Sequence, residues 1–502
     1  MAIHSLYMPF RPLQALAVIV ALLLVYAARI YLLPEGGVPG YDGVRNWQIA
    51  GEIASGNFTN LFFHRSPLFH LFNGFLYHFL PDPRQMVRVN ALFTVLAVYV
   101  TGRLVARHLQ LSGSLFACVI LLAGSCVYMV HISRYLTIEA ASLPAFAFFL
   151  QNYLKRSETN TTKYWYWSVF WLAVGLSINY KLVVLFPVVL ALELFQPSQV
   201  MSKQVMFRSV AILASPFLFF GCIGLFFGLP WWRYPASYVG FVRFSTPNAA
   251  MRVGKFNTDI SFYFRYLLQF ESPLAWLGLI FYPILFKPWQ YLRKQPLQLH
   301  DVLAIICYCF LLGMALLLKA PRGLNFAYLP LYLLGFLCLF RVLKNKKLLL
   351  YGSIFISILF CGFKIQQNIY RYSYSAYPEA AQKIKEIGIK RVGQTVGNGL
   401  LPFSGKNSFA VQPLVWKEDV QAFTSRKPAW LLSDTYYILT NIQGFDSWQH
   451  FPAQAVFASP ALLSPYLFLE HAEFTGLGFS ETMQLRQKAL KRPYQLRLIK
   501  IE

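Results

Sequence analysis

The chain has 502 residues, of which 57% are hydrophobic, 17% aromatic and only 13% charged. Soluble proteins carry roughly 25% charged residues, so this composition excludes a soluble globular protein and indicates one that crosses a membrane several times. The formal net charge of +25 does not indicate nucleic-acid binding, because the basic residues recur in short clusters between apolar runs and not in one basic domain.

Long apolar runs predict about eleven transmembrane helices, since about twenty helical residues cross the hydrocarbon layer. The first run is expected to be a signal anchor and not a cleaved signal peptide. Two further segments, 44–56 and 66–80, are expected to form helices that lie along the membrane surface. The expected spans are 12–33, 86–107, 114–132, 137–154, 164–180, 182–196, 209–229, 272–289, 302–319, 323–342 and 348–366.

The distribution of Lys and Arg predicts the orientation of these spans. With the N-terminus in the cytoplasm and 34–85 as one outer loop, the basic loops all fall inside, as the positive-inside rule requires. If 66–80 crossed the membrane, every later loop would change sides. We therefore expect a multi-pass protein of the plasma or inner membrane, with everything after 366 outside; the inner loops are 155–163, 197–208, 287–301 and 341–347.

The stretch 367–502 is more polar and predicts a small soluble α/β domain outside the membrane, next to a transmembrane domain of residues 1–366. Pro378–Ile387 reads as a helix. Short alternating or apolar segments predict strands, and no catalytic motif is visible among them. The expected strands are 408–414, 429–433, 466–470 and 494–501.

Two acidic residues lie where an outer loop meets an apolar span, in a chain with 20 Asp and Glu against 45 Lys and Arg. Asp42 follows the first span, and Glu139 lies near the start of a later one. A carboxylate at such a boundary is a candidate for chemistry. The alternatives are that Asp42 caps a helix and that Glu139 pairs with Arg134.

Cations are more frequent in the outer loops than the positive-inside rule predicts. Lys181 and Arg322 each stand between two apolar spans, where a snorkelling anchor is the alternative. A cationic outer face suits a phosphate headgroup whose polyprenyl tail stays in the lipid, because Lys and Arg bind phosphate oxygens with charge-assisted hydrogen bonds. Other outer cations are Arg65, Arg134, Arg233, Arg243, Arg252, Lys255, Arg265 and Lys319.

The order of these features resembles the GT-C glycosyltransferases of the protein O-mannosyltransferase and aminoarabinose transferase type. After the first span come an acidic residue, the motif A-x-x-I-A-S-G-N, R-Y-x-x-x-E opening a helix, and G-L-x-x-x-x-K. The resemblance covers roughly 12–345, and its specificity comes from the order of short motifs. It implies a GT-C fold with about eleven transmembrane helices.

By this resemblance, Asp42 takes the place of the first-loop catalytic aspartate and Glu139 that of the second acid. Lys181 and Arg322 take the places of cations that face the donor phosphate. The family often has Asp-Glu where this chain has Asp42-Gly43, which weakens a metal-binding role, so no cofactor is assigned and a divalent metal is left open. It often has Lys-Pro or Pro-Pro where this chain has His64-Arg65-Ser66-Pro67, so His64 or Arg65 is expected to supply a cation there.

The implied reaction is inverting transfer of a sugar from a polyprenyl-phosphate donor to an acceptor outside the cytoplasm. Asp42 is the expected base, and Lys181 and Arg322, helped by Arg265 and Arg65, are expected to hold the phosphate. The acceptor is open among protein, lipid A-like and glycan hydroxyls. The alternatives are a flippase for a lipid-linked glycan without transferase activity, and a membrane scaffold. The absence of a visible internal repeat weighs against an inverted-repeat transporter.

Overall fold

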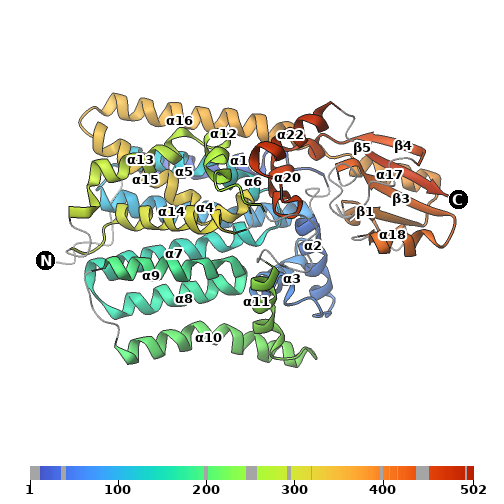
Figure 1. Cartoon of the computed structure of the whole chain (residues 1–502), viewed down its shortest axis with the longest axis horizontal. Helices are drawn as coiled ribbons and strands as arrows, with labels where there is room; N and C mark the ends of the chain where they lie inside the picture. Colours follow the sequence, from blue (N-terminus) through green and yellow to red (C-terminus); the bar gives the residue numbers. More distant parts are fainter. Residues whose placement is uncertain are drawn as a thin grey trace.

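The computed structural model describes residues 12–35, 41–196, 202–244, 257–290, 295–317, 319–395, 399–405, 408–414, 417–436, 451–491 and 495–502. A bundle of roughly parallel and antiparallel helices makes up most of the molecule, and a five-stranded sheet lies at one end of it (Figure 1). The described N-terminal end and the C-terminus lie at opposite ends of the long axis.

The helices of the first half follow the predicted segments closely. Asp82 caps the helix that begins at Pro83, and its side chain accepts a hydrogen bond from the backbone N–H of Arg84 at 2.8 Å. Their bounds are α1 Pro12–Ile30, α2 Tyr41–Ala54, α3 Pro67–Tyr77, α4 Pro83–His108, α5 Gly113–Gly124, α6 Val127–Ile132, α7 Ile138–Thr159, α8 Thr162–Ile178 and α9 Leu185–Phe195.

The second half of the bundle holds α10 Lys203–Phe226, α11 Arg233–Phe244, α12 Phe262–Phe270, α13 Pro273–Phe286, α14 Leu299–Ala315, α15 Tyr328–Leu343 and α16 Lys347–Asn368. Three single-turn 3₁₀ helices join elements near one end of the bundle: η1 Phe63–Arg65, η2 Tyr180–Val184 and η4 Pro321–Leu324. Further short turns are η3 Pro288–Gln290, η5 Tyr370–Tyr372, η6 Leu401–Phe403 and η8 Pro460–Leu463.

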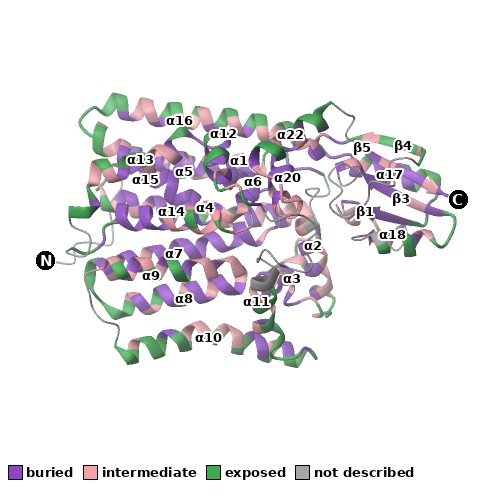
Figure 2. Ribbon diagram, viewed as in Figure 1, coloured by how far each residue is buried: buried purple, intermediate pink, exposed green. Residues whose placement is uncertain are grey.

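Four helical stretches in the described part of the chain are long and apolar enough to cross a bilayer: α1, α4, α10 and the stretch that begins with α16. The helices α5, α14 and α15 are apolar but shorter. The chain is a multi-pass membrane protein, while the count of eleven spans and their direction stay predictions. Figure 2 shows α7 and α15 largely buried, with much of α10 and α16 exposed, as expected for helices that face lipid.

The predicted single span 114–132 is wrong in one respect, because the structure divides it into α5 and α6. The chain breaks at Ser125-Cys126, and the carboxylate of Glu271 accepts hydrogen bonds from the backbone N–H groups of Val127 at 3.0 Å and Tyr128 at 2.9 Å. These are two of the unpaired donors at the start of α6. A side chain distant in sequence therefore stabilises a break that apolar composition alone does not reveal.

The sheet has the strand order β2-β1-β3-β5-β4. β1 pairs parallel with β2 and β3, whereas β5 pairs antiparallel with β3 and β4. The strands are β1 Arg391–Thr395, β2 Ala410–Leu414, β3 Ala429–Asp434, β4 Ala453–Ala458 and β5 Gln495–Ile501. The accompanying helices are α17 Tyr377–Ile387, α18 Lys417–Thr424, α20 Pro465–Glu470, α21 Ala472–Thr475 and α22 Phe479–Leu490.

The predicted strand at 466–470 is wrong, because this segment forms α20. Pro465 stands in the first turn, where its fixed φ favours a helix. Tyr466 and Leu469 pack into the core of the helical bundle, whereas Phe468 packs into the core of the sheet. A helix buried on two sides is apolar all round, so its sequence imitates that of a buried strand.

Candidate active site

Asp42 lies in the first turn of α2 and faces the side chains of His64 and Arg322. One carboxylate oxygen lies 3.3 Å from Nε2 of His64 on η1, and the other lies 3.2 Å from a terminal nitrogen of Arg322. Burial favours the neutral acid, but His64, Arg322 and Lys181 together hold the pKa of Asp42 well below its ordinary value. Because 41% of the side chain is exposed, solvent also screens these charges.

The backbone beside Asp42 is strained at two successive positions. His64 and Arg65 both have positive φ, at 49° and 59°, which residues with a Cβ rarely adopt. Such a conformation costs on the order of 1 kcal/mol or more per residue and persists only where neighbours enforce it. Here it turns the His64 ring toward Asp42 and the Arg65 side chain toward Tyr180, whose ring centre lies 4.8 Å from the guanidinium carbon.

Arg322 is at the centre of the cluster and meets three carboxylates. Besides Asp42, it forms an ion pair with Glu473 and another with Glu470, whose Oε2 lies 3.0 Å from Nε without hydrogen-bond alignment. The backbone N–H of Arg322 also donates to Glu470 at 3.2 Å. Burial disfavours the charged form, but the surrounding acids raise the pKa of Arg322 above its ordinary value. The guanidinium is therefore charged in this site.

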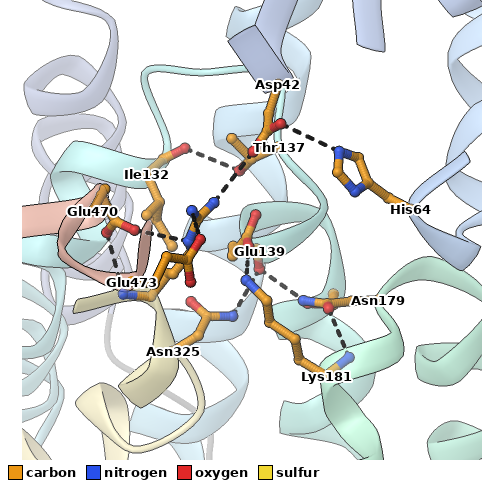
Figure 3. Close-up of polar contacts among 12 residues, drawn as sticks. Asp42, His64, Ile132, Thr137, Glu139, Asn179, Lys181, Asn325, Glu470 and Glu473 are labelled. Atoms are coloured by element: carbon orange, nitrogen blue, oxygen red, sulfur yellow. Dashed lines mark hydrogen bonds and ion pairs between the residues drawn. The ribbon is translucent and has the colours of Figure 1, made fainter. Parts of the chain in front are cut away.

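Lys181 and Glu139 form a second ion pair close by, with 2.5 Å between Nζ and Oε1 (Figure 3). Asn325, just after η4, donates to the backbone oxygen of Glu139 at 3.1 Å and so ties this pair to the loop of Arg322. Asn179 accepts from the backbone of Lys181 at 3.0 Å. Burial disfavours the ammonium ion, but Glu139 outweighs it and raises the pKa of Lys181.

The alternative interpretation that Glu139 pairs with Arg134 is not what the structure contains. Arg134 instead donates to the backbone oxygen of Leu32 at 2.7 Å and to the hydroxyl of Ser373 at 2.8 Å. It thereby binds the end of the first helix to the start of the C-terminal region. Its function in the fold is that of a bridge between distant segments.

Two of the predicted phosphate ligands lie apart from the Arg322 cluster. Arg65 donates to the backbone oxygen of Ser237 at 2.5 Å, and its guanidinium lies over the Tyr180 ring. Arg265, on α12, donates to the hydroxyl of Ser480 at 2.7 Å. The described contacts of Arg265 thus join it to α22 and not to Lys181 or Arg322.

The sequence reasoning missed Glu470 and Glu473, which come from α20 and α21 in the C-terminal region. Figure 3 shows both in the same group of polar side chains as Asp42 and Glu139. Burial raises the pKa of Glu470 to about 7, although Arg322 and a 2.8 Å hydrogen bond from Tyr128 favour its ionised form. The available signal was two acids three residues apart at the end of an apolar aromatic run, which is unusual in a chain so poor in acid.

The cluster contains four carboxylates against two permanent cations, Arg322 and Lys181. Among the residues that the structure describes, no group of three or more His, Cys, Asp and Glu side chains is arranged to hold a metal ion. The site interleaves carboxylates, which can accept a proton, with two cations that are already paired with them.

Residues 66–220 match the family model of dolichyl-phosphate-mannose-protein mannosyltransferases. The whole structure is similar to the crystal structure of ArnT from Cupriavidus metallidurans bound to undecaprenyl phosphate, with a TM-score of 0.54 and 13% identity over 85% of this chain and 94% of that one. A search of curated proteins found no match. The fold is that of a GT-C membrane protein, and the predicted resemblance to the GT-C superfamily is confirmed. The matched segment includes Glu139 and Lys181, and it ends well before Arg322.

Proposed function

We propose that the protein is an integral membrane glycosyltransferase that moves a sugar from a polyprenyl phosphate to an acceptor outside the cytoplasm. The observation that carries the proposal is the contact between Asp42 and Arg322 at 3.2 Å, beside the Lys181–Glu139 pair. The proposed base and the two cations that we propose for the phosphate lie within one cluster. The family match and the fold shared with a protein bound to undecaprenyl phosphate support this donor class.

In the proposed reaction, the acceptor oxygen attacks the anomeric carbon as the bond from that carbon to the phosphate oxygen breaks. The electron pair leaves with the phosphate, and the acceptor proton passes to Asp42, with inversion at the anomeric carbon. Arg322 and Lys181 stabilise the charge that grows on the leaving phosphate. Glu139 holds Lys181 in position, and His64 orients the Asp42 carboxylate.

Donor binding and the basicity of Asp42 are coupled in this scheme. Asp42 is a weak base while Arg322 neutralises it, because the guanidinium lowers its pKa. A phosphate that engages Arg322 draws that charge away from Asp42, so the carboxylate becomes more basic when the donor is in place.

The test is to incubate the purified protein in lipid with a labelled polyprenyl-phosphate sugar and a crude acceptor fraction. We expect release of polyprenyl phosphate that depends on Asp42. Movement of intact donor between leaflets without any release would instead favour the flippase alternative. Hexosyl and pentosyl donors, tested in parallel, would identify the sugar class.

A further inference from the structure

The C-terminal region places two acids on the arginine that the proposed function assigns to the donor phosphate. Glu470 ends α20 and Glu473 lies in α21, and both bind Arg322, which also contacts Asp42 of the first loop. Both helices begin in the segment 465–475, which packs on the bundle through Tyr466, Leu469 and Ala472. The contact therefore connects the sheet region directly to the candidate site.

All three guanidinium nitrogens of Arg322 are engaged in the structure. Nε faces Glu470, one terminal nitrogen faces Asp42 and the other faces Glu473. A phosphate binds arginine through two parallel N–H groups on one edge of the guanidinium. Because a carboxylate already lies against each of these nitrogens, a phosphate that takes two N–H groups on one edge competes with at least one carboxylate for Arg322.

The charges lead to the same conclusion. Even with Glu470 protonated, three carboxylates face two permanent cations before any donor arrives. A phosphate brings further negative charge, and like charges a few ångströms apart in a half-buried site repel strongly. Binding is favourable only if an acid is protonated or moves away.

The two acids are not held equally. Glu470 accepts a hydrogen bond from Tyr128 at 2.8 Å and another from the backbone of Arg322 at 3.2 Å, in addition to its ion pair. For Glu473, the described polar contact is the ion pair with Arg322. Glu473 is thus the acid that a competing anion can replace with the smaller loss of contacts.

We propose that Glu473 is a displaceable latch that occupies Arg322 until the donor phosphate replaces it, so that donor binding loosens the segment 465–475. This inference rests on the proposed function, because it takes Arg322 as a phosphate ligand. Glu470 and Tyr128 keep the segment attached to the bundle when the latch opens. Glu473 is accordingly a positioning residue that acts through Arg322.

The test measures binding of undecaprenyl phosphate to the full-length protein in lipid nanodiscs. E473Q removes the competing charge and keeps the shape of the side chain, so we expect the probe to bind about fivefold tighter or more. Damage to the fold would weaken binding and cannot imitate this result. E386Q, on the exposed face of α17, is the matched control and should bind as the parent protein does.

R322A separates the latch from the proposed function. If R322A weakens binding and E473Q tightens it, both proposals are supported. If R322A weakens binding but E473Q leaves it unchanged or weaker, the latch is wrong and the phosphate site stands. If R322A has no effect, Arg322 is not a phosphate ligand and both proposals fail.

Hydrogen exchange in the unaltered protein gives an independent measurement. Adding undecaprenyl phosphate should speed exchange of the backbone amides of 465–475, because the segment loses one of its attachments. Exchange that is unchanged or slowed in this segment, at a probe concentration that saturates the site, would overturn the latch.

Discussion

At the scale of single residues, Asp42 matters because its carboxylate contacts His64 and Arg322 at a half-exposed position. D42N keeps the shape and hydrogen-bonding capacity of the side chain but cannot accept a proton. We expect turnover to fall about 10²- to 10⁴-fold, the usual contribution of a general base. The measurement is the initial rate of polyprenyl phosphate release at saturating donor.

The control for D42N is D419N, on α18 in the sheet region, which should leave the rate unchanged. The thermal unfolding midpoint of D42N should also stay close to that of the parent protein, since the side chain is not in the core. Turnover within about threefold of the parent protein would remove Asp42 from the role of base.

The raised pKa of Glu470 predicts how the stability of the protein depends on pH. Its ordinary pKa of 4.5 is raised to about 7 by burial, against the opposing effects of Arg322, Tyr128 and Lys181 and with the added repulsion of Glu473. The folded protein therefore keeps a proton that the unfolded chain loses. The contribution of this group to stability falls as pH rises from about 4.5 to about 7 and does not return above that.

E470Q imitates the protonated acid at every pH, so its unfolding midpoint should match that of the parent protein near pH 5 and exceed it near pH 8. Comparing the two proteins cancels all other titrating groups. If instead the unfolding midpoint of E470Q falls to or below that of the parent protein as pH rises, attraction to Arg322 outweighs the cost of burying the Glu470 charge.

At the scale of elements, the crossing of α13 and α15 depends on two glycines. A Cβ on Gly335 would lie 2.2 Å from the backbone oxygen of Leu274, and one on Gly278 would lie 2.6 Å from the backbone nitrogen of Gly335. Small residues let membrane helices approach this closely, where van der Waals contact replaces the hydrophobic effect as the attraction. The same α15 follows directly on the loop of Arg322.

We predict that G335V destabilises the protein by about 1–3 kcal/mol, as overpacking of a close contact does. The measurement is the unfolding midpoint in a fixed detergent. A Cβ on Gly352, in α16, would meet no neighbouring atom within 4 Å, so G352V is the matched control. Equal midpoints for the two variants would show that the α13–α15 crossing can relax without cost.

The sequence predicts most helices to within a few residues, because apolar runs of sufficient length have few alternatives in a membrane protein. It does not predict the break between α5 and α6 or the helical state of Tyr466–Glu470. Both are decided by contacts with distant residues, Glu271 in the first case and the two packed cores in the second. The hydrophobic pattern of a short segment does not indicate such long-range contacts.

The residues of the candidate site likewise fall into those that the sequence predicted and those that it missed. Asp42, Glu139, Lys181 and Arg322 were chosen from their position where outer loops meet spans, and His64 from the family resemblance. The structure brings all five into one cluster. Glu470 and Glu473 were missed, since a contact between residues 148 positions apart leaves no periodic trace. Arg265 was chosen as one of the cations of the outer loops, and its described partner Ser480 lies elsewhere.

At the scale of the whole molecule, the site lies at the end of the bundle that meets the sheet, because Glu470 and Glu473 reach it from the C-terminal region. The proposed function requires this end to face outward, where the headgroup of a translocated donor is found. The basic loops between spans should then face the cytoplasm at the other end.

A reporter fused after Glu502 tests this orientation for the molecule as a whole. Alkaline phosphatase, which is active only outside the cytoplasm, should be active there, whereas a fluorescent protein that folds only inside should stay dark. Fusions truncated after Asn160, in the predicted inner loop, should give the opposite result and serve as the control. The reverse pattern at both positions would put Asp42 and Arg322 on the cytoplasmic face, and the acceptor would then have to be cytoplasmic. Opposite results at the two sites would mean that an odd number of spans lies between residues 160 and 502, as the predicted topology requires.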